Sequence, residues 1–219
     1  MHIFDRLREL PYNESSEAWH SSYMFSDNYY PVLQQLALDY RAVDILEVGV
    51  RLGYSATSFV DGNPYVRTYT GLDNESYLPG SNAKALQNIR HVRPDLPVSV
   101  SKLDTMSDDP SRLLIDRRFD FVHIDGDHTE AGAYRDIMRF WPYVLPGGRM
   151  LVDDSSNIAD VRNAIKRAVA ELKTPNYDVA SLRGTWIIYK PQSSVSADRT
   201  TGTSLSVIPI TSRSLKINS

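Results

Sequence analysis

Residues 119–128 read Phe-Asp-Phe-Val-His-Ile-Asp-Gly-Asp-His, an apolar strand pattern that runs directly into two carboxylates and an imidazole. The apolar run as far as Ile124 predicts a buried strand. In open α/β sheets, ligands bind beyond the carboxyl ends of the strands. Asp125, Asp127 and His128 are therefore the first candidates for chemistry.

The same order, an apolar strand followed by an acid and a helix, recurs along the chain. Further strands are predicted over residues 45–50, 68–72, 98–103 and 149–152, with helices over 54–60, 81–91, 130–141 and 158–172. Pro146, Gly147 and Gly148 predict a turn before the strand at 149–152, and residues 177–180 and 185–189 predict two closing strands. This alternation is typical of an α/β fold: a Rossmann-like, doubly wound, mostly parallel seven-stranded sheet with helices on both faces.

The predicted core spans residues 42–190 and is flanked by two segments of different composition. Residues 1–41 hold a predicted helix over 31–40 and an aromatic-rich cluster: Trp19, His20, Tyr23, Met24, Phe25, Tyr29 and Tyr30. This N-terminal extension is expected to act as a lid or a dimer contact, or to pack against the sheet. Residues 191–219 are rich in Ser and Thr and predict a flexible tail, with an edge strand over 205–210 as the alternative.

The composition favours a small-molecule partner. The 219 residues hold 24 Lys and Arg against 27 Asp and Glu, and no run of like charge marks a nucleic-acid or membrane surface. The absence of cysteine excludes disulfides, thiolate zinc sites and cysteine nucleophiles. The chain shows no leader-like start and no run of roughly 18 apolar residues, so a cytoplasmic location is expected. The sequence leaves open whether the chain forms a homo-oligomer.

A glycine pair marks the first strand-to-helix turn, in the stretch Glu47-Val-Gly-Val-Arg-Leu-Gly53. Gly49 permits a tight turn, and Gly53 permits close approach of a ligand to the helix start. The dinucleotide fingerprint Gly-x-Gly-x-x-Gly is not met, because Arg51 stands at its second glycine position. The stretch therefore argues against NAD.

Glu47-x-Gly49-x-x-x-Gly53 and Gly71-Leu-Asp73 resemble the first and second motifs of the class I S-adenosylmethionine-dependent methyltransferases, and the resemblance extends from about residue 44 to 189. It implies that the first loop holds the methionine moiety, that Asp73 holds both ribose hydroxyls and that Asp104 lies near the adenine amino group. A carboxylate suits a cis-diol, because charge-assisted hydrogen bonds are strong. A solvated loop acid is the alternative at both positions. The expected cofactor site comprises Glu47, Gly49, Val50, Arg51, Gly53, Ser55, Asp73, Asn74, Asp104, Thr105 and Asp125.

The segment Asp125-Gly-Asp-His128, taken with Asp153-Asp154, resembles the metal-dependent small-molecule O-methyltransferases of catechols and of macrolide and aminocoumarin sugars, and also the cephalosporin hydroxylase group. The resemblance implies that Asp125, Asp153 and Asp154 bind a divalent ion, and carboxylates with waters suit Mg²⁺. His128 is the candidate general base and Asp127 its rival. Alternatively, Asp127 caps the helix near residue 130, and Asp154 or Ser155 caps the helix near 158.

The sequence thus predicts an enzyme that moves a methyl group from S-adenosylmethionine to a hydroxyl of a small molecule, such as a sugar or catechol in secondary metabolite or antibiotic biosynthesis, with Mg²⁺ assisting. One rival is a metal-independent methyltransferase that uses His128 as base on an oxygen, nitrogen or carbon. The other is a non-catalytic protein that binds S-adenosylmethionine or serves in assembly. His123, inside the strand, is expected to be structural.

Overall fold

The computed structural model describes residues 2–13, 29–179 and 184–192, which form a seven-stranded sheet in the order β3-β2-β1-β4-β5-β7-β6. Strands β1 to β5 are parallel, and β7 runs antiparallel to both of its neighbours. The predicted Rossmann-like, mostly parallel sheet is confirmed. The strands are β1 (Asp44–Val48), β2 (Thr68–Asp73), β3 (Val98–Lys102), β4 (Phe119–Ile124), β5 (Val144–Val152), β6 (Asn176–Val179) and β7 (Thr185–Tyr189).

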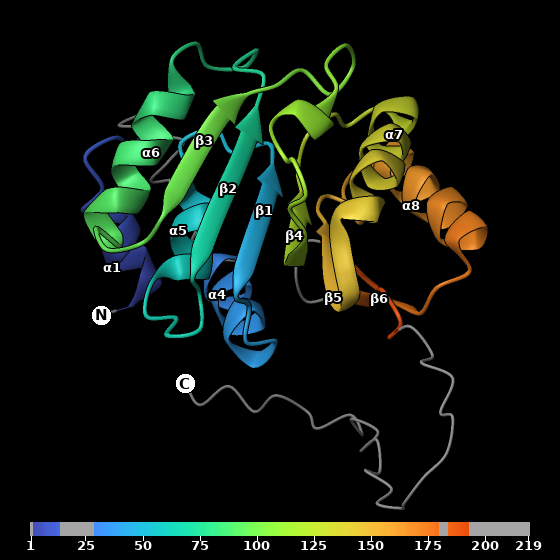
Figure 1. Ribbon diagram of the computed structural model, residues 1–219, viewed down its shortest axis with the longest axis horizontal. Coiled ribbons are helices and arrows are strands. Elements are labelled where there is room, and N and C mark those ends of the chain that lie inside the picture. Colours follow the sequence, from blue (N-terminus) through green and yellow to red (C-terminus); the bar gives the residue numbers. More distant parts are fainter. Residues whose placement is uncertain (1, 14–28, 180–183, 193–219) are drawn as a thin grey trace, which may run out of the picture.

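Helices cover both faces of the sheet (Figure 1). One layer holds α1 (Ile3–Arg8), α4 (Tyr29–Asp39), α5 (Tyr54–Val60) and α6 (Ser81–Val92); the other holds α7 (Glu130–Phe140) and α8 (Ala159–Leu172). Because successive side chains of a strand point to opposite faces, β1 supplies both cores. Ile45 is buried with the first layer, whereas Leu46 and Val48 are buried with the second.

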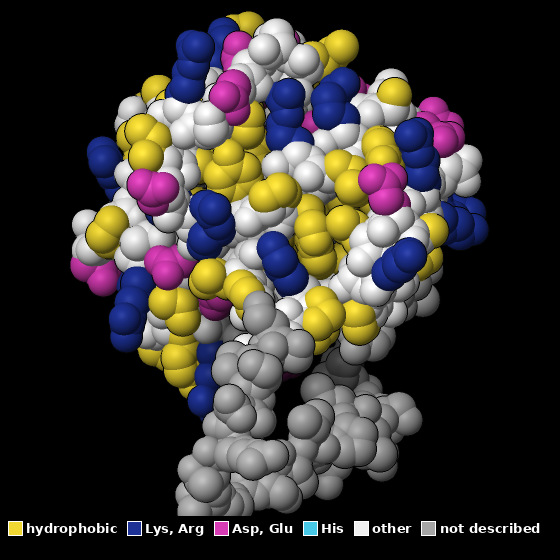
Figure 2. Space-filling model, turned by 45° about the vertical axis from the view of Figure 1, so that its right-hand side comes forward, with side chains coloured by type: hydrophobic (Ala, Val, Ile, Leu, Met, Phe, Trp, Pro, Cys, Tyr) yellow, Lys and Arg dark blue, Asp and Glu magenta, His cyan; other side chains and the backbone are white. Residues whose placement is uncertain are grey.

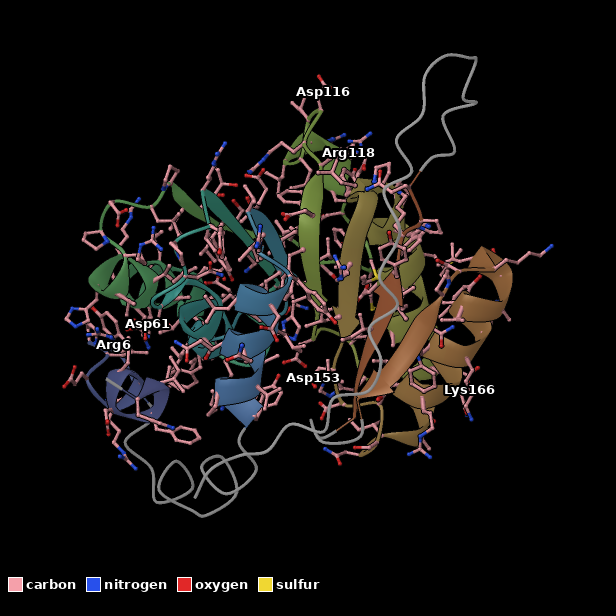
Figure 3. The ribbon with its side chains drawn as sticks, turned by 90° about the horizontal axis from the view of Figure 1, so that it is seen from below. Arg6, Asp61, Asp116, Arg118, Asp153 and Lys166 are labelled. Atoms are coloured by element: carbon pink, nitrogen blue, oxygen red, sulfur yellow. The ribbon has the colours of Figure 1, made fainter. Side chains whose placement is uncertain are left out.

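The N-terminal helices pack into the first of these cores. Ile3, Leu7 and Leu33 are buried there, and Arg6 Nε lies 3.3 Å from Oδ1 of Asp61 at the end of α5 (Figure 3). Most of the aromatic cluster of the N-terminal extension lies outside the described residues: Trp19, His20, Tyr23, Met24 and Phe25. Residues 193–219, with the alternative edge strand at 205–210, also lie outside them.

The elements differ from the expected ones chiefly at β5. The predicted turn at Pro146-Gly-Gly148 lies inside this strand, where the register with β4 shifts between Phe119 and Phe121. Gly147 adopts a φ of 85° in this bulge, and its N–H donates to the carbonyl of Lys190. A glycine-rich segment can thus kink a strand without ending it, since glycine accepts the left-handed backbone that a bulge needs.

The strand order determines where a ligand can bind. The chain moves outward from β1 through β2 to β3 and then crosses back to β4 on the other side of β1. At such a switch point the loops after neighbouring strands diverge and leave a crevice at the carboxyl edge of the sheet. The arrowheads of β1, β2 and β3 point to that edge (Figure 1).

Candidate active site

A cavity of about 570 Å³ lies at the carboxyl ends of β1 to β4. Its lining comprises Val48, Gly49, Arg51, Leu72, Asp73, Asn74, Ser76, Tyr77, Leu103, Asp104, Thr105, Met106, Asp125, Gly126, Asp127 and His128. Most of the expected cofactor residues are among them. Four are not: Glu47, Val50, Gly53 and Ser55. The sequence motifs therefore predicted most of the cavity lining. They did not predict Ser76, Tyr77 and Met106, which belong to no motif.

Gly49 brings the loop after β1 into direct contact with the loop after β4. Its φ is 87°, and a Cβ at this position would overlap the carbonyl oxygen of Asp125. The N–H of Asp125 donates to the carbonyl of Val48 at 2.8 Å, which fixes the two loops together. Only glycine combines this backbone conformation with such close packing.

Asp73 fastens the glycine loop to the end of β2. Its Oδ2 accepts the N–H groups of Val50 and Arg51, both at 2.9 Å, and its Oδ1 accepts the N–H of Glu75 at 2.6 Å. A carboxylate oxygen has about two lone pairs, so Oδ1 retains capacity for a ligand hydroxyl. Beyond this loop, the guanidinium carbon of Arg51 lies 4.5 Å from the ring centroid of the exposed Tyr77.

Asp104 lines the far end of the cavity but is also engaged by its own loop. Its Oδ1 accepts the N–H of Met106 at 2.9 Å, and its Oδ2 lies 3.2 Å from the hydroxyl of Ser107. Such local bonds are typical of an Asp that shapes a turn. The position is compatible with an adenine contact, which stays a prediction.

Glu47 and Ser55 lie beneath the cavity and not on its wall. Glu47 is fully buried and accepts hydrogen bonds from the hydroxyls of Ser55 and Tyr69. Its Oε1 lies 3.0 Å from Nδ1 of His123, which is also fully buried. Burial lowers the pKa of His123, but the hydrogen bond and charge of Glu47 outweigh it and raise the pKa to about 9. The expected ligand contact of Glu47 is thus replaced by a buried ion pair that holds β1 to β4.

Two acids and an imidazole converge at the β4 and β5 end of the site. Nε2 of His128 lies 3.3 Å from Oδ1 of Asp125 and 3.3 Å from Oδ2 of Asp154. Burial raises the pKa of Asp125 to about 6, against the opposing effect of the hydrogen bond with His128. The same hydrogen bond raises the pKa of His128. Asp125 and Asp154 are half-buried and His128 is exposed, so the cluster is open to a ligand from one side.

Asp153 does not belong to this cluster, which corrects the expected metal set of Asp125, Asp153 and Asp154. It is buried beside the first turn of α4 (Figure 3), where its Oδ2 accepts the hydroxyl of Tyr29. Its Oδ1 lies 3.1 Å from the hydroxyl of Thr185 on β7. Burial and the charge of Asp153 raise the pKa of Tyr29, so the phenol remains a donor. The hydrogen bonds with Tyr29 and Thr185 hold the carboxylate of Asp153 away from the cluster, and His128 is the third member of the cluster instead.

Asp127 supports the start of α7. Its Oδ1 accepts the N–H of Thr129 at 2.9 Å, and its Oδ2 lies 3.4 Å from Nη2 of Arg135. Although burial opposes it, these partners lower the pKa of Asp127, which makes it a weak base. The N-cap itself is Thr129, whose side chain accepts the N–H of Gly132.

The alternative that Asp154 or Ser155 caps α8 is wrong. The N-cap of α8 is Ile158, which makes no side-chain capping bond. Asp154 instead adopts a φ of 59°, and its carbonyl accepts the N–H groups of Asn157 and Ile158. Oδ2 of its carboxylate lies in the cluster with His128, and Oδ1 lies 3.5 Å from Nδ2 of Asn157.

The donor atoms of the cluster fit a divalent cation. One ligand atom each from Asp125, His128 and Asp154 lies within 4.8 Å of the other two. Two carboxylates alone would satisfy Mg²⁺, which keeps several waters, whereas the imidazole is a donor that softer ions prefer.

The surface of the molecule shows no segregation by charge on the face drawn in Figure 2, where basic and acidic side chains are interspersed. Among the helices that the structure describes, none is long and apolar enough to cross a membrane.

Residues 46–155 match a protein family that is described as a methyltransferase domain. A search of curated proteins finds no match to the chain. Three solved structures illustrate the shared fold. The O-methyltransferase from Bacillus cereus, in complex with S-adenosylhomocysteine, has a TM-score of 0.59 and 18% identity over 86% of this chain and 90% of that one.

The O-methyltransferase TomG from Streptomyces achromogenes, involved in tomaymycin synthesis and in complex with S-adenosylmethionine, has a TM-score of 0.56 and 17% identity over 86% of this chain and 95% of that one. The N-methyltransferase NodS from Bradyrhizobium japonicum, in complex with S-adenosylhomocysteine, has a TM-score of 0.58 and 13% identity over 88% of this chain and all of that one. At these identities the likeness shows the fold and does not distinguish oxygen from nitrogen acceptors.

Proposed function

The chain belongs to the methyltransferase-domain family, and we propose that it moves the methyl group of S-adenosylmethionine to a hydroxyl of a small molecule with the help of a divalent cation. One observation carries this proposal. A single cavity joins Asp73 and Asp104 at one end to Asp125 and His128 at the other, so that a donor nucleoside and a polar acceptor site share one space.

The cavity suits the methyl donor in size and in polar groups. Its volume of about 570 Å³ is within the usual range for small-molecule sites. Oδ1 of Asp73 would accept a ribose hydroxyl, Asp104 would lie near the adenine, and the loop at Gly49 would hold the methionine moiety. The solved relatives in complex with S-adenosylmethionine or S-adenosylhomocysteine support this assignment.

The acceptor half of the site must align an oxygen with the methyl group and remove its proton. A divalent ion, when bound, lowers the pKa of a coordinated hydroxyl and orients it. Asp125 and Asp154 would hold that ion, and their half-buried positions leave room for the acceptor. The acceptor class, a sugar or a catechol of secondary metabolism, follows from the resemblance of Asp125-Gly-Asp-His128 and Asp153-Asp154 to metal-dependent O-methyltransferases.

Two rivals remain for the test to separate. Without a metal, Nε2 of His128 would have to act as the base, but the carboxylates of Asp125 and Asp154 already approach this atom, at 3.3 Å each. A non-catalytic binding protein would have no need of a cluster of acids and imidazole on the cavity wall.

Calorimetric titration with S-adenosylhomocysteine tests the donor half. Asp73→Asn keeps an oxygen for the N–H groups of Val50 and Arg51 but places an amide nitrogen where Oδ1 would accept the ribose, so we expect affinity to fall by about tenfold or more. The matched control is Asp95→Asn, an exposed acid outside the cavity lining, which should leave affinity unchanged. Wild-type protein that fails to bind the ligand would refute the proposal.

Methyl transfer from labelled S-adenosylmethionine to a panel of catechols and sugars tests the acceptor half. We expect turnover to stop when a chelator removes divalent ions and to return when an ion is restored. Turnover that survives the chelator would favour the metal-independent rival, and donor binding without transfer to any acceptor would favour the non-catalytic one.

A further inference from the structure

His128 lies between the two half-buried acids. Its Nε2 is the atom that both carboxylates approach, at 3.3 Å from Asp125 and 3.3 Å from Asp154. From this we propose that Nε2 is a ligand of the bound cation and not the catalytic base, and that the cation is a first-row transition ion such as Zn²⁺ or Co²⁺ in preference to Mg²⁺. A role of the ion in methyl transfer rests on the proposed function, whereas the binding of the ion to these three residues does not.

The spacing of the donor atoms matches one shared ion. Zn²⁺ binds imidazole nitrogen and carboxylate oxygen at about 2.0 to 2.2 Å, and tetrahedral bonds of that length separate neighbouring ligand atoms by roughly 3.3 to 3.6 Å. Both distances from Nε2 are 3.3 Å, and the third separation is within 4.8 Å. The two separations from Nε2 are therefore those that a single ion requires.

The types of donor decide the class of ion. Mg²⁺ takes oxygen ligands almost exclusively and gives up its waters reluctantly. Imidazole is a ligand for Zn²⁺, Fe²⁺, Ni²⁺ and their neighbours. The oxygen that would have completed an all-oxygen set is on Asp153, and its two oxygens are engaged by Tyr29 and Thr185. The described residues thus offer two oxygens and one nitrogen.

The partial exposure of the cluster is typical of a catalytic metal site. Side-chain exposure is 32% for Asp125, 48% for His128 and 27% for Asp154, so the ion would have an uncovered side. Catalytic sites for such ions typically combine three protein ligands with one open position. Because Asp125 and His128 also line the cavity, that position would be available to the acceptor oxygen.

Co²⁺ is a suitable probe, because its visible absorption reports the number and type of its ligands. The full chain, freed of metal, would be titrated with Co²⁺ in the absence and presence of excess Mg²⁺. We expect one Co²⁺ per chain, which excess Mg²⁺ does not displace. His128→Asp should lower Co²⁺ affinity by at least about tenfold and allow Mg²⁺ to compete, because it converts the set to three carboxylates.

The matched control is His91→Asp, at an exposed position on α6, which should leave Co²⁺ binding unchanged. Asp154→Asn and Asp153→Asn form a second pair, of which only the first should weaken binding. Co²⁺ binding that is unaffected by His128→Asp, equally weakened by both Asn variants, or absent in the wild type would overturn the proposal. Loss of S-adenosylhomocysteine binding would instead contradict the proposed function and leave this result intact.

Discussion

Replacing Glu47 by Gln should make the stability of this protein lose much of its dependence on pH. Glu47 and His123 form a fully buried ion pair, with 3.0 Å between Oε1 and Nδ1. Gln preserves the volume but removes the charge and keeps only one of the two oxygens, of which Oε1 accepts the hydroxyl of Ser55 and Oε2 that of Tyr69. Burial then acts on His123 alone and keeps its imidazole neutral in the folded state.

The size of the effect follows from the pKa of His123, which is raised from 6.5 to about 9 on folding. Because the folded pKa is the higher one, the stabilisation is complete below pH 6.5 and is lost as the pH rises through about 9. A change of one pKa unit corresponds to about 1.4 kcal/mol, so the pair contributes roughly 3 kcal/mol at its maximum.

Urea unfolding at several pH values between 6 and 10 would measure this. The free energy of unfolding of the wild type should exceed that of Glu47→Gln by roughly 3 kcal/mol near pH 6, and the gap should close above pH 9. The raised pKa of His128 affects both proteins alike and cancels in the difference. Asp95→Asn, which breaks an exposed pair with Arg93, should change little at any pH. A gap that stays constant across this range would refute the reasoning.

Three further predictions concern the site itself. Gly49→Ala should abolish S-adenosylhomocysteine binding and should lower stability by much more than Gly62→Ala. Both glycines have a positive φ, which costs an alanine about 1 to 2 kcal/mol, but only a Cβ at Gly49 overlaps the carbonyl of Asp125. Equal thermal shifts for the two variants would contradict this. Tyr29→Phe should cost about 1 to 3 kcal/mol by removing the donor to Oδ2 of buried Asp153, and an unchanged melting temperature would count against that contact. Because the pKa values of two proposed ligands, Asp125 and His128, are raised, that of Asp125 to about 6, protons should compete with Co²⁺ and its affinity should fall as the pH drops from 8 to 5; an affinity flat over this range would exclude the proposed ligand set.

The sequence predicted the elements well because their signals are local. The helix expected over 54–60 is α5, and the other expected helices differ by one or two residues at their ends, whereas α1 (Ile3–Arg8) was not predicted. The error at β5 arose because a Pro-Gly-Gly segment is compatible with a bulge as well as with a turn. Which of the two forms depends on the neighbouring strand β4, and no short stretch of sequence contains that information.

The candidate site was likewise predictable in part. The alternation of strand and helix implied a parallel sheet, and parallel strands bring their carboxyl ends to one edge, so Asp73, Asp104 and Asp125 could be assigned to one cavity from sequence alone. Only the tertiary structure decided which acids act together. Asp153 is turned toward Tyr29, 124 residues earlier in the chain, and His128 takes its place beside Asp154. The physical reason is that a strand pattern predicts the position of a residue along the sheet but not the direction of its side chain. The direction of a carboxylate depends on its hydrogen-bond partners, and these come from segments that meet only in the folded protein.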